Sequence, residues 1–571
     1  MTTKNEPQAT IFQLFAWQNA KNKFAKSKFA SYFLLGLSYL IITFGQPAYS
    51  AFCSLITATV GFALFFIEIA DLKAKRRAWI GFLFFFSVQL VQLFWFTYHP
   101  VTAVCFAYLL LSFLMGLQFG FLSLFVTKKT LRSPLGMLLL ASIWTILEWS
   151  RIYWCSGFYF DLTGISLTSN LLSLQTASLF GVLGMSFWVI LTNALMAHVI
   201  LFPTRKACLF SLAITLLPYI YGAWHLEHHA KEQSLYDSQN PPIQALIVHS
   251  KNVPDEFKKE PPKALSPQAK ALASWKELIS AIAPFYGQQF DLLLMPEGVV
   301  PYGSTSLLFT KDELERLFSR AFNANSSYLQ DPELCSEDIA QAISSLYASP
   351  LIIGLEGIER PLYYNSAFCF LPNTPGRPLR YDKQVLVPMG EYIPLTWAKQ
   401  IAAKYGVFDS FTPGYEARLF DTGKHKIGPS ICYEETVGSL MRQNSALGAT
   451  LLVNLTDDYW FPYSQLARQH YEHARPRTLE NGTPLIRSCN YGISGAIDSL
   501  GRTVVAKEGQ ELPSAFIATL SSYHYKTIYG RFGDIPILLI SICVILASLL
   551  KVGIREFSRS QVTSKHLKSD R

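Results

Sequence analysis

Three residues of this chain have the types and the settings that acyl transfer through a cysteine requires. Glu297, Lys383 and Cys432 lie, in that order, at or near the ends of short strand-like runs. A free thiol has a pKa of about 8.5 and needs a proton acceptor to attack at neutral pH. A carboxylate within reach takes that proton, and a fixed ammonium stabilises the thiolate and the oxyanion that forms at an attacked carbonyl. We therefore expect Glu297 to be the general base, Lys383 the stabilising cation and Cys432 the nucleophile.

Three more residues stand close enough in the sequence to support this site. We expect Glu391, in the same predicted loop as Lys383, to anchor the lysine or a water molecule. Glu434 is expected to hold the loop that follows the thiol, and Tyr433 either donates from its hydroxyl group or only packs. Each residue type taken singly has a commoner structural role, in a turn, on the surface or in the core. The joint pattern, in order and in context, is what favours a catalytic site.

The stretch that carries these residues, 225–531, has the mixed charge and the Pro and Gly content of a soluble domain. Short apolar runs bounded by Gly, Pro or Asn predict buried strands, at 243–248, 291–295, 351–355, 367–371, 426–432, 450–455, 485–489 and 493–497. Apolar spacings of three and four residues predict helices at 269–282 and 311–324, and a weaker helix at 465–480 that Pro476 interrupts. The alternation of buried strands with helices predicts a layered α/β domain.

The remainder of the chain is too apolar for an ordinary soluble protein. Of the 571 residues, 50% are hydrophobic and 16% are charged, and the long uncharged runs fall outside the α/β stretch. A membrane-spanning helix needs about 20 mostly apolar residues. Eight segments qualify as spans, at roughly 30–48, 51–70, 78–97, 102–126, 135–154, 177–201, 207–224 and 533–551.

Lysine and arginine alternate between successive loops. Basic groups lie near 21–28, 73–77, 128–132, 205–206 and 551–571, whereas none occurs near 46–50, 98–101 and 155–176. Because basic loops stay in the cytoplasm, we expect both termini inside and the α/β domain outside. The net charge of +9 comes largely from these loops and indicates contact with anionic lipid rather than with nucleic acid.

The predicted organisation has five parts. They are a cytoplasmic segment (1–28), a membrane domain of seven helices (29–224), the external catalytic domain (225–531), a last transmembrane helix (532–552) and a basic cytoplasmic tail (553–571). A signal peptide at the first apolar run is disfavoured, because the polar region before it is long and a second apolar run follows at once.

Other reactive side chains form weaker patterns. The nine cysteines show no CxxC pair and no zinc-like spacing. The cysteines of the external domain are expected either to form a disulfide or to be buried free thiols. No metal or cofactor is expected. No carboxylate or thiol completes a ligand set around the histidines, so structural roles are expected for His225, His228, His229, His470 and His473. Glu148 and Arg151, near the end of a span, form either an ion pair that holds the helix end or a contact with lipid headgroups.

Longer motifs resemble the bacterial apolipoprotein N-acyltransferases, which join a multi-span membrane part to a nitrilase-like (carbon–nitrogen hydrolase) αββα sandwich. The most specific is the lysine loop Tyr-x-Lys-x-x-Leu-Val-Pro-x-Gly-Glu-Tyr-x-Pro, at Tyr381–Pro394. Further matches are Cys-Tyr-Glu at 432–434, Asn-x-x-x-Asp-x-Trp-Phe at 454–461, His-x-x-x-Ala-Arg at 470–475, Arg-Ser-x-Asn-x-Gly-Ile-Ser at 487–494, and the membrane segments 147–151 and 527–534. The resemblance covers nearly the whole chain and implies that the superfamily's Glu–Lys–Cys triad falls on the three residues predicted above.

Two positions depart from the family pattern. Met295 stands where family members carry a Trp before the Pro-Glu pair, and no Trp stands near Phe257 or Lys259, where the family carries one on a mobile arm. The sequence therefore assigns no substrate contacts to this arm.

The resemblance implies a two-step transfer at a bacterial inner membrane, with the catalytic domain in the periplasm. Cys432 takes an acyl chain from a phospholipid as a thioester, and the α-amino group of a diacylglyceryl-modified apolipoprotein then receives it as an amide. A monomer is the default expectation. One alternative is a membrane-tethered nitrilase-type amidase that uses the same triad with water. The other is a transporter or receptor whose outer domain only binds a ligand, against which the complete triad and the few charges in the predicted spans count.

Overall fold

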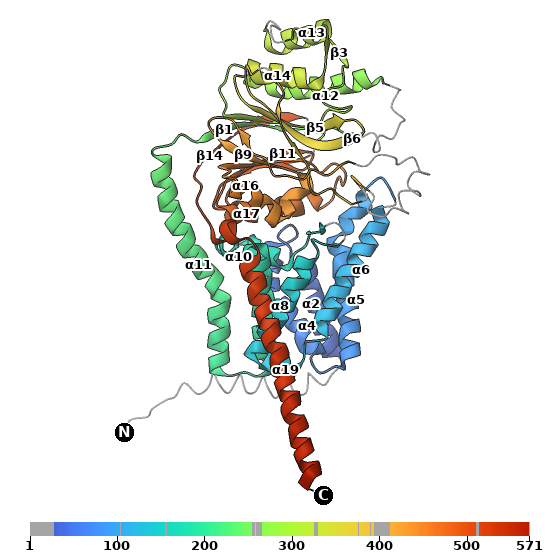
Figure 1. The fold of residues 1–571 in the computed structure, drawn as a ribbon, viewed down its shortest axis with the longest axis vertical. Coiled ribbons are helices and arrows are strands. Elements are labelled where there is room, and N and C mark those ends of the chain that lie inside the picture. Colours follow the sequence, from blue (N-terminus) through green and yellow to red (C-terminus); the bar gives the residue numbers. More distant parts are fainter. Residues whose placement is uncertain are drawn as a thin grey trace, which may run out of the picture.

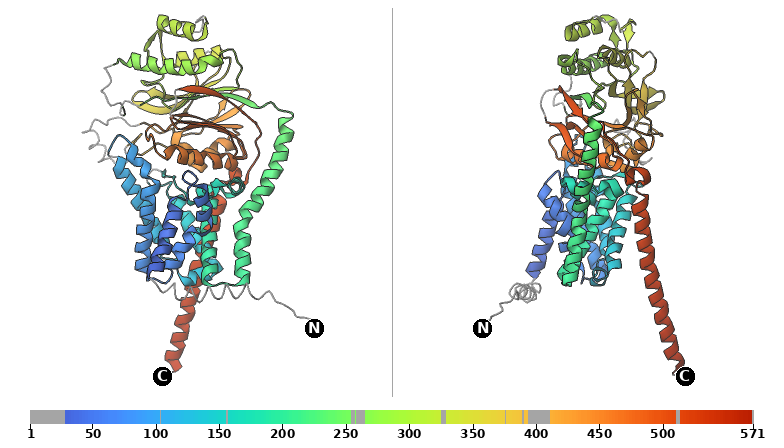
Figure 2. Two further views of the ribbon diagram at one scale, coloured as in Figure 1. Left: turned by 180° about the vertical axis from the view of Figure 1, so that it is seen from behind. Right: turned by 90° about the vertical axis from the view of Figure 1, so that its left-hand side faces the viewer.

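The computed structural model consists of a bundle of helices with an α/β part stacked on one end (Figure 1). It describes residues 28–569, with only the helical backbone of 555–569, and omits 103, 155–156, 254–256, 258–264, 325–328, 375, 389, 393–410 and 510–512. Figure 2 shows that the C-terminal end of the last helix lies at the end of the bundle opposite to the α/β part.

Each of the eight predicted spans is helical. They are α2 (Lys28–Thr43), the stretch of α3 (Ala51–Ile56), η1 (Thr57–Gly61) and α4 (Phe62–Ile69), then α5 (Ala74–Gln92), α6 (Val104–Ser123), α8 (Pro134–Ser150), α10 (Ala177–Leu201), α11 (Arg205–Asp237) and α19 (Ile535–Ser569). Within the described part of the chain, five are long and apolar enough to cross a membrane: the stretch 51–69, α6, α10, α11 and the first part of α19. Helices α2 and α8 are apolar but shorter, and α5 begins with a basic turn.

Small residues let α5 and α6 approach each other closely. A Cβ atom added at Gly81 would lie 2.1 Å from Ser123 Oγ, and one at Gly120 would lie 2.9 Å from the carbonyl oxygen of Ala78. Close backbone packing of this kind drives helix association in lipid. There the hydrophobic effect contributes little, because lipid tails are as apolar as the side chains that face them. The contact between these two helices therefore depends on residues without side chains.

Two helices connect the bundle to the α/β part and flank it (Figures 1 and 2). Helix α11 continues beyond the predicted end of its span and leads into β1 (Ile243–His249). Helix α19 follows the last strand and the short helix α18 (Ile528–Phe532). Both expose most of their apolar side chains, as helices that face lipid do.

The α/β part contains two facing six-stranded sheets. Their strand orders are β14-β1-β2-β5-β6-β7 and β13-β12-β11-β10-β9-β8. The first sheet consists of β1, β2 (Leu292–Leu294), β5 (Leu351–Glu359), β6 (Leu362–Phe370), β7 (Leu379–Asp382) and β14 (Ser514–Leu520). The second consists of β8 (Phe420–Asp421), β9 (Lys426–Ile431), β10 (Leu451–Asp457), β11 (Leu485–Asn490), β12 (Ile493–Ile497) and β13 (Thr503–Glu508). In each sheet three neighbouring strands run parallel, so their carboxyl ends meet at one edge.

Helices cover the outer faces of both sheets (Figure 1). Those over the first sheet are α12 (Pro267–Ile282), α13 (Lys311–Phe322) and α14 (Ser336–Leu346). Those between the second sheet and the bundle are α16 (Gly438–Ala446) and α17 (Leu466–Asn481). Apolar residues such as Ile247, Leu294 and Val453 fill the space between the sheets. This order of layers confirms the predicted αββα sandwich on a multi-span helical domain.

The sequence patterns found the buried strands and missed elements with polar or small residues. Strand β13 is largely exposed, so it carries no apolar run, and β7 and β14 are only partly buried. The prediction that Pro476 interrupts its helix was wrong, because α17 continues through it. Proline removes one backbone hydrogen bond, but most side chains of α17 are buried and this packing holds the helix together.

Candidate active site

Cys432 lies at a sharp turn between a strand and a short helix. It follows β9 directly and begins the 3-10 helix η7 (Cys432–Thr436). Its φ of +52° is in the left-handed region, which costs a non-glycine residue of order 1–3 kcal/mol and is concentrated at functional sites. The Cys432 carbonyl oxygen accepts hydrogen bonds from Asn454 Nδ2 at 3.1 Å and His470 Nε2 at 3.3 Å. Polar side chains from β10 and α17 therefore hold the strained turn.

The first sheet brings together the other predicted catalytic groups. Lys383 Nζ lies 3.2 Å from Glu297 Oε1 and 2.7 Å from Glu391 Oε1. Asn365 Nδ2 donates to the same two oxygens, at 2.7 and 2.8 Å. Gly354 on β5 makes room for this arrangement, because a Cβ atom there would lie 2.5 Å from Glu297 Cα. Two carboxylates, one ammonium and one amide thus form a closed hydrogen-bonded group.

Electrostatic effects connect this group to the thiol. Burial raises the pKa of the Cys432 thiol well above its ordinary value, the charge of Glu297 raises it further, and Lys383 opposes both. Burial lowers the pKa of Lys383, but attraction to Glu297, Glu391 and Cys432 outweighs it, so its pKa lies well above the ordinary value. Lys383 is therefore an ammonium, and Cys432 is a protonated thiol until a base removes its proton. The structure brings Glu297, Lys383 and Cys432 to one place.

Glu434 joins the turn at Cys432 to the loop that follows Lys383. Its Oε1 accepts from the backbone N–H groups of Gln384 at 2.6 Å and Val385 at 3.1 Å, while its Oε2 accepts from Ile431 N–H at 2.8 Å. The hydroxyl of Tyr381 donates to it at 3.0 Å. Burial raises the pKa of Glu434 to about 7, against the effect of these donors. The carboxylate thus fixes the two loops relative to each other.

Tyr433 joins the same turn to the helical bundle. Its hydroxyl donates to the Gly157 carbonyl oxygen at 2.6 Å and accepts from Tyr159 N–H at 2.7 Å. Its ring stacks on Phe160, with centroids 5.8 Å apart. Both hydrogen-bonding roles of the hydroxyl are therefore taken by the loop between α8 and α10.

A second buried group of charges lies behind Cys432 and was not expected from the sequence. It comprises Glu435, Asp458, His470 and Arg487, all almost completely buried. Asp458, His470 and Arg487 stood within motifs of the family resemblance, which was the one available signal of their role. Among the described residues, no set of three or more His, Cys, Asp or Glu side chains is placed to hold a metal ion.

Neither reading of Glu148 and Arg151 matches the structure. Arg151 is completely buried and its Nε donates to Gln118 Oε1 at 2.9 Å, so it does not face lipid headgroups. Glu148 Oε1 accepts from Thr163 N–H at 2.8 Å, and no direct ion pair joins Glu148 to Arg151 within the described part of the bundle. The partners of both side chains instead lie on neighbouring helices, Gln118 on α6 and Thr163 on η4 (Thr163–Ser169).

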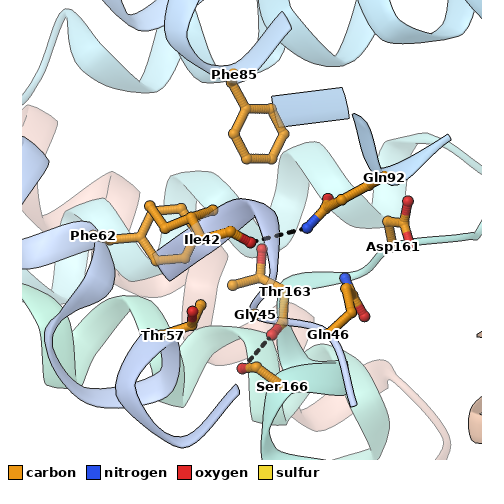
Figure 3. Close-up of a pocket in the computed structure, with 10 residues that line it drawn as sticks. All are labelled: Ile42, Gly45, Gln46, Thr57, Phe62, Phe85, Gln92, Asp161, Thr163 and Ser166. Atoms are coloured by element: carbon orange, nitrogen blue, oxygen red, sulfur yellow. Dashed lines mark hydrogen bonds between the residues drawn. The ribbon is translucent and has the colours of Figure 1, made fainter. Parts of the chain in front are cut away.

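A small polar cavity lies between α2, α4, α5 and the loop before α10 (Figure 3). Its volume of about 20 Å³ suits about one water molecule. Gln92 Nε2 donates to the Ile42 carbonyl oxygen at its rim, and Asp161 also lines it. No predicted catalytic residue lines this cavity, which is too small for a lipid.

Of the positions that depart from the family pattern, the structure describes Phe257 and Met295. Phe257 packs edge-on against Tyr459, with ring centroids 5.4 Å apart, and Lys259 lies outside the described residues. Met295 is buried in the core beside the first sheet.

Known proteins match both parts of the chain. A family model described as Carbon-nitrogen hydrolase matches residues 262–521, and the Apolipoprotein N-acyltransferase N-terminal domain matches residues 40–195. The apolipoprotein N-acyltransferase of Chlamydia pneumoniae is 32% identical over 543 residues, which cover 90% of this chain and 96% of the relative. That of Chlamydia caviae is 31% identical over 551 residues, which cover 90% and 95%.

Among solved structures, Saccharomyces cerevisiae Nit3, a member of branch 10 of the nitrilase superfamily, is 15% identical, with a TM-score of 0.34. The match covers 52% of this chain and 95% of that one. The similarity to the two chlamydial relatives extends across the helical bundle and the sandwich. This chain belongs to the apolipoprotein N-acyltransferase family.

Proposed function

We propose that this protein transfers an acyl chain from a phospholipid to the α-amino group of a diacylglyceryl-modified apolipoprotein, through a thioester on Cys432. The observation that carries the proposal is the convergence of Cys432 from one sheet with Glu297 and Lys383 from the other. All of these groups come from one chain, so a monomer suffices.

In the first half-reaction Glu297 takes the thiol proton, and the Cys432 sulfur attacks an ester carbonyl of the phospholipid. Lys383 stabilises the oxyanion of the tetrahedral intermediate. The carbon–oxygen bond of the ester then breaks, Glu297 returns the proton to the leaving alkoxide, and a lysophospholipid departs. The acyl chain remains on sulfur.

In the second half-reaction the neutral amine of the acceptor attacks the thioester. Glu297 accepts a proton from the attacking nitrogen as the amide forms and returns it to the sulfur as the carbon–sulfur bond breaks. The thiol of Cys432 is thereby restored. Dividing one difficult transfer into two easier steps is the usual gain from a covalent intermediate.

The surroundings of Cys432 favour transfer over hydrolysis. The apolar core of the helical bundle extends to η7 through Tyr433, Val437 and Leu440, and Val385 and Phe461 pack against it. Cys432 itself packs against the same cluster. An apolar site at a bilayer excludes the water that would otherwise hydrolyse the thioester.

We propose that the α/β domain (225–531) lies in the periplasm and both termini in the cytoplasm, with 29–224 and 532–552 in the inner membrane. The predicted loops without lysine or arginine contact the α/β domain, which supports this orientation. The ring of His99 stacks on that of Trp460, with centroids 5.7 Å apart, and Arg475 Nη1 donates to the Thr168 carbonyl oxygen at 3.0 Å. In intact cells, a membrane-impermeant thiol reagent should label T374C, and K206C only after permeabilisation. The reverse pattern would contradict the orientation.

Mass spectrometry of the purified protein mixed with phospholipid tests the function. We expect an acyl mass on Cys432, its discharge when a diacylglyceryl lipopeptide is added, and no turnover in C432S or E297Q. An adduct on another cysteine would contradict the site assignment. Release of ammonia from an amide would instead support the amidase alternative, and full function of C432A would support a transporter or receptor.

A further inference from the structure

His470 on α17 makes hydrogen bonds that connect the strained turn at Cys432 to three buried charges. Its Nε2 lies 3.3 Å from the Cys432 carbonyl oxygen and 3.2 Å from Glu435 Oε1. Its Nδ1 lies 2.8 Å from Asp458 Oδ1 and 2.9 Å from Arg487 Nη2. The side chain is 3% exposed, so protein groups make nearly all of its contacts.

The contacts assign a proton to Nε2. Both neighbours of Nε2 are acceptors, so Nε2 carries a hydrogen. Nδ1 lies between Asp458 Oδ1, which accepts, and Arg487 Nη2, which can only donate. Burial raises the pKa of Asp458, but attraction to His470 and Arg487 outweighs burial and holds this pKa below its ordinary value, so Asp458 is a carboxylate.

Charged groups hold the partners of the ring in place. Arg487 pairs with Glu435 and, at 3.3 Å, with Asp458. Two further groups from α17, His473 and Arg477, act electrostatically on this cluster, and the ring of Phe160 lies against it.

The carbonyl group of Cys432 needs such donors. Cys432 has a left-handed φ, and the pairing of β9 with β10 ends one residue before it, at Ile431. Asn454 and His470 donate to its carbonyl oxygen. The orientation of this peptide fixes the direction of the Cα–Cβ bond and hence the position of the sulfur relative to Glu297 and Lys383.

We infer that His470 is a positioning residue for the nucleophile: its protonated Nε2, which lies between the Cys432 carbonyl oxygen and Glu435, holds that carbonyl so that the sulfur faces Glu297 and Lys383. It transfers no proton in either half-reaction. The inference deepens the proposed function and rests on Cys432 being the residue that is acylated.

Two substitutions separate the roles of the ring nitrogens. In H470Q the amide nitrogen reaches the place of Nε2 and keeps a donor toward Cys432, whereas in H470N it reaches only the place of Nδ1 and keeps a donor toward Asp458. H524N removes an exposed imidazole elsewhere and serves as the matched control. The readouts are the rate of acyl-Cys432 formation by mass spectrometry, its dependence on phospholipid concentration, and the rate at which iodoacetamide alkylates Cys432.

We expect H470N to form the acyl-enzyme about 10- to 100-fold more slowly, as loss of a donor to a buried carbonyl group predicts, with little change in KM. The rate in H470Q should stay within about threefold of the wild-type rate, because the amide keeps a donor to the Cys432 carbonyl. The rate in H524N should equal that of the wild type. Equal rates in H470N and H470Q, or unfolding of both, would overturn the inference, because the Cys432 contact would then not decide the outcome.

The alkylation rates keep this result separate from the proposed function. They should follow the same order, with H470N slow and H470Q like the wild type, whatever acyl donor is present. Should the wild type form no acyl-Cys432 at all, the proposed function fails, and the alkylation order alone then supports or overturns the positioning role.

Discussion

The two sheets of the sandwich contribute different chemistry to the site. The first sheet supplies Glu297, Asn365 and Lys383, which satisfy one another with hydrogen bonds of 2.7 to 3.2 Å. The second sheet supplies Cys432, which has a strained backbone and apolar neighbours. Glu297 and Lys383 are thus stabilised by hydrogen bonds within their own group, whereas the position of Cys432 depends on the residues that pack around it. Glu434 joins the two sides, and each substitution below acts on one side or on the junction.

Removal of the nucleophile should have the largest effect. C432A leaves the ionic group of the first sheet intact but removes the only atom that can carry the acyl chain, so transfer should fall by a factor of about 10⁴ or more. Turnover of phospholipid into acylated lipopeptide measures this. C208A, which removes an exposed thiol from α11, is the control and should retain activity. Residual acylation of C432A at the wild-type rate would refute the covalent route.

Loss of the cation should come next. K383M leaves Glu297 and Glu391 without their shared ammonium and removes the oxyanion partner, so the rate of acyl-enzyme formation should fall by about 10²- to 10³-fold. Single-turnover kinetics with excess enzyme measure the step. Lys424, which pairs with Asp291 at the protein surface, provides the matched control K424M. Similar losses in both variants would mean that the effect is a general one of charge.

Glu434, which joins the two sides of the site, should make the stability of the protein depend on pH. Burial raises the pKa of Glu434 from 4.5 to about 7, so between these values the folded state holds a proton that the unfolded state has lost. Stability therefore decreases as pH rises through this window, by about 3 kcal/mol for this group. Thermal unfolding in detergent at pH 5 and pH 8 should show wild type losing stability relative to E434Q, which cannot titrate. A difference that stays constant with pH would contradict the assignment.

The contact between the turn and the helical bundle should have the smallest effect. Y433F removes the bonds to Gly157 and Tyr159 and should lower the free energy of unfolding by about 1–3 kcal/mol, since two buried backbone groups lose a partner. The shift in unfolding midpoint measures it. Y463F, at a tyrosine that is 64% exposed, should leave the midpoint unchanged. A much larger loss of activity than of stability would show that the hydroxyl takes part in the reaction.

Much of the architecture was predictable because it depends on local patterns. Eight helices lie where long apolar runs predicted spans, since a helix in lipid must satisfy its own backbone hydrogen bonds and cover itself with apolar side chains. The buried strands of the sandwich were predictable from short apolar runs. The exposed strand β13 was not, because its pairing with β12, and not its own composition, makes it a strand.

Within the proposed site, the reacting groups could be predicted from the sequence: a carboxylate, a lysine and a cysteine in a family-specific order and context. Their hydrogen-bond partners could be found only in the folded structure. It paired Asn365 with both carboxylates, used the Tyr433 hydroxyl as a link to the helical bundle, and placed His470 behind Cys432. These contacts join residues that are far apart along the chain and lie on different elements. Hydrogen bonds between such residues depend on how the sheets and helices pack, and this packing cannot be predicted from local sequence patterns.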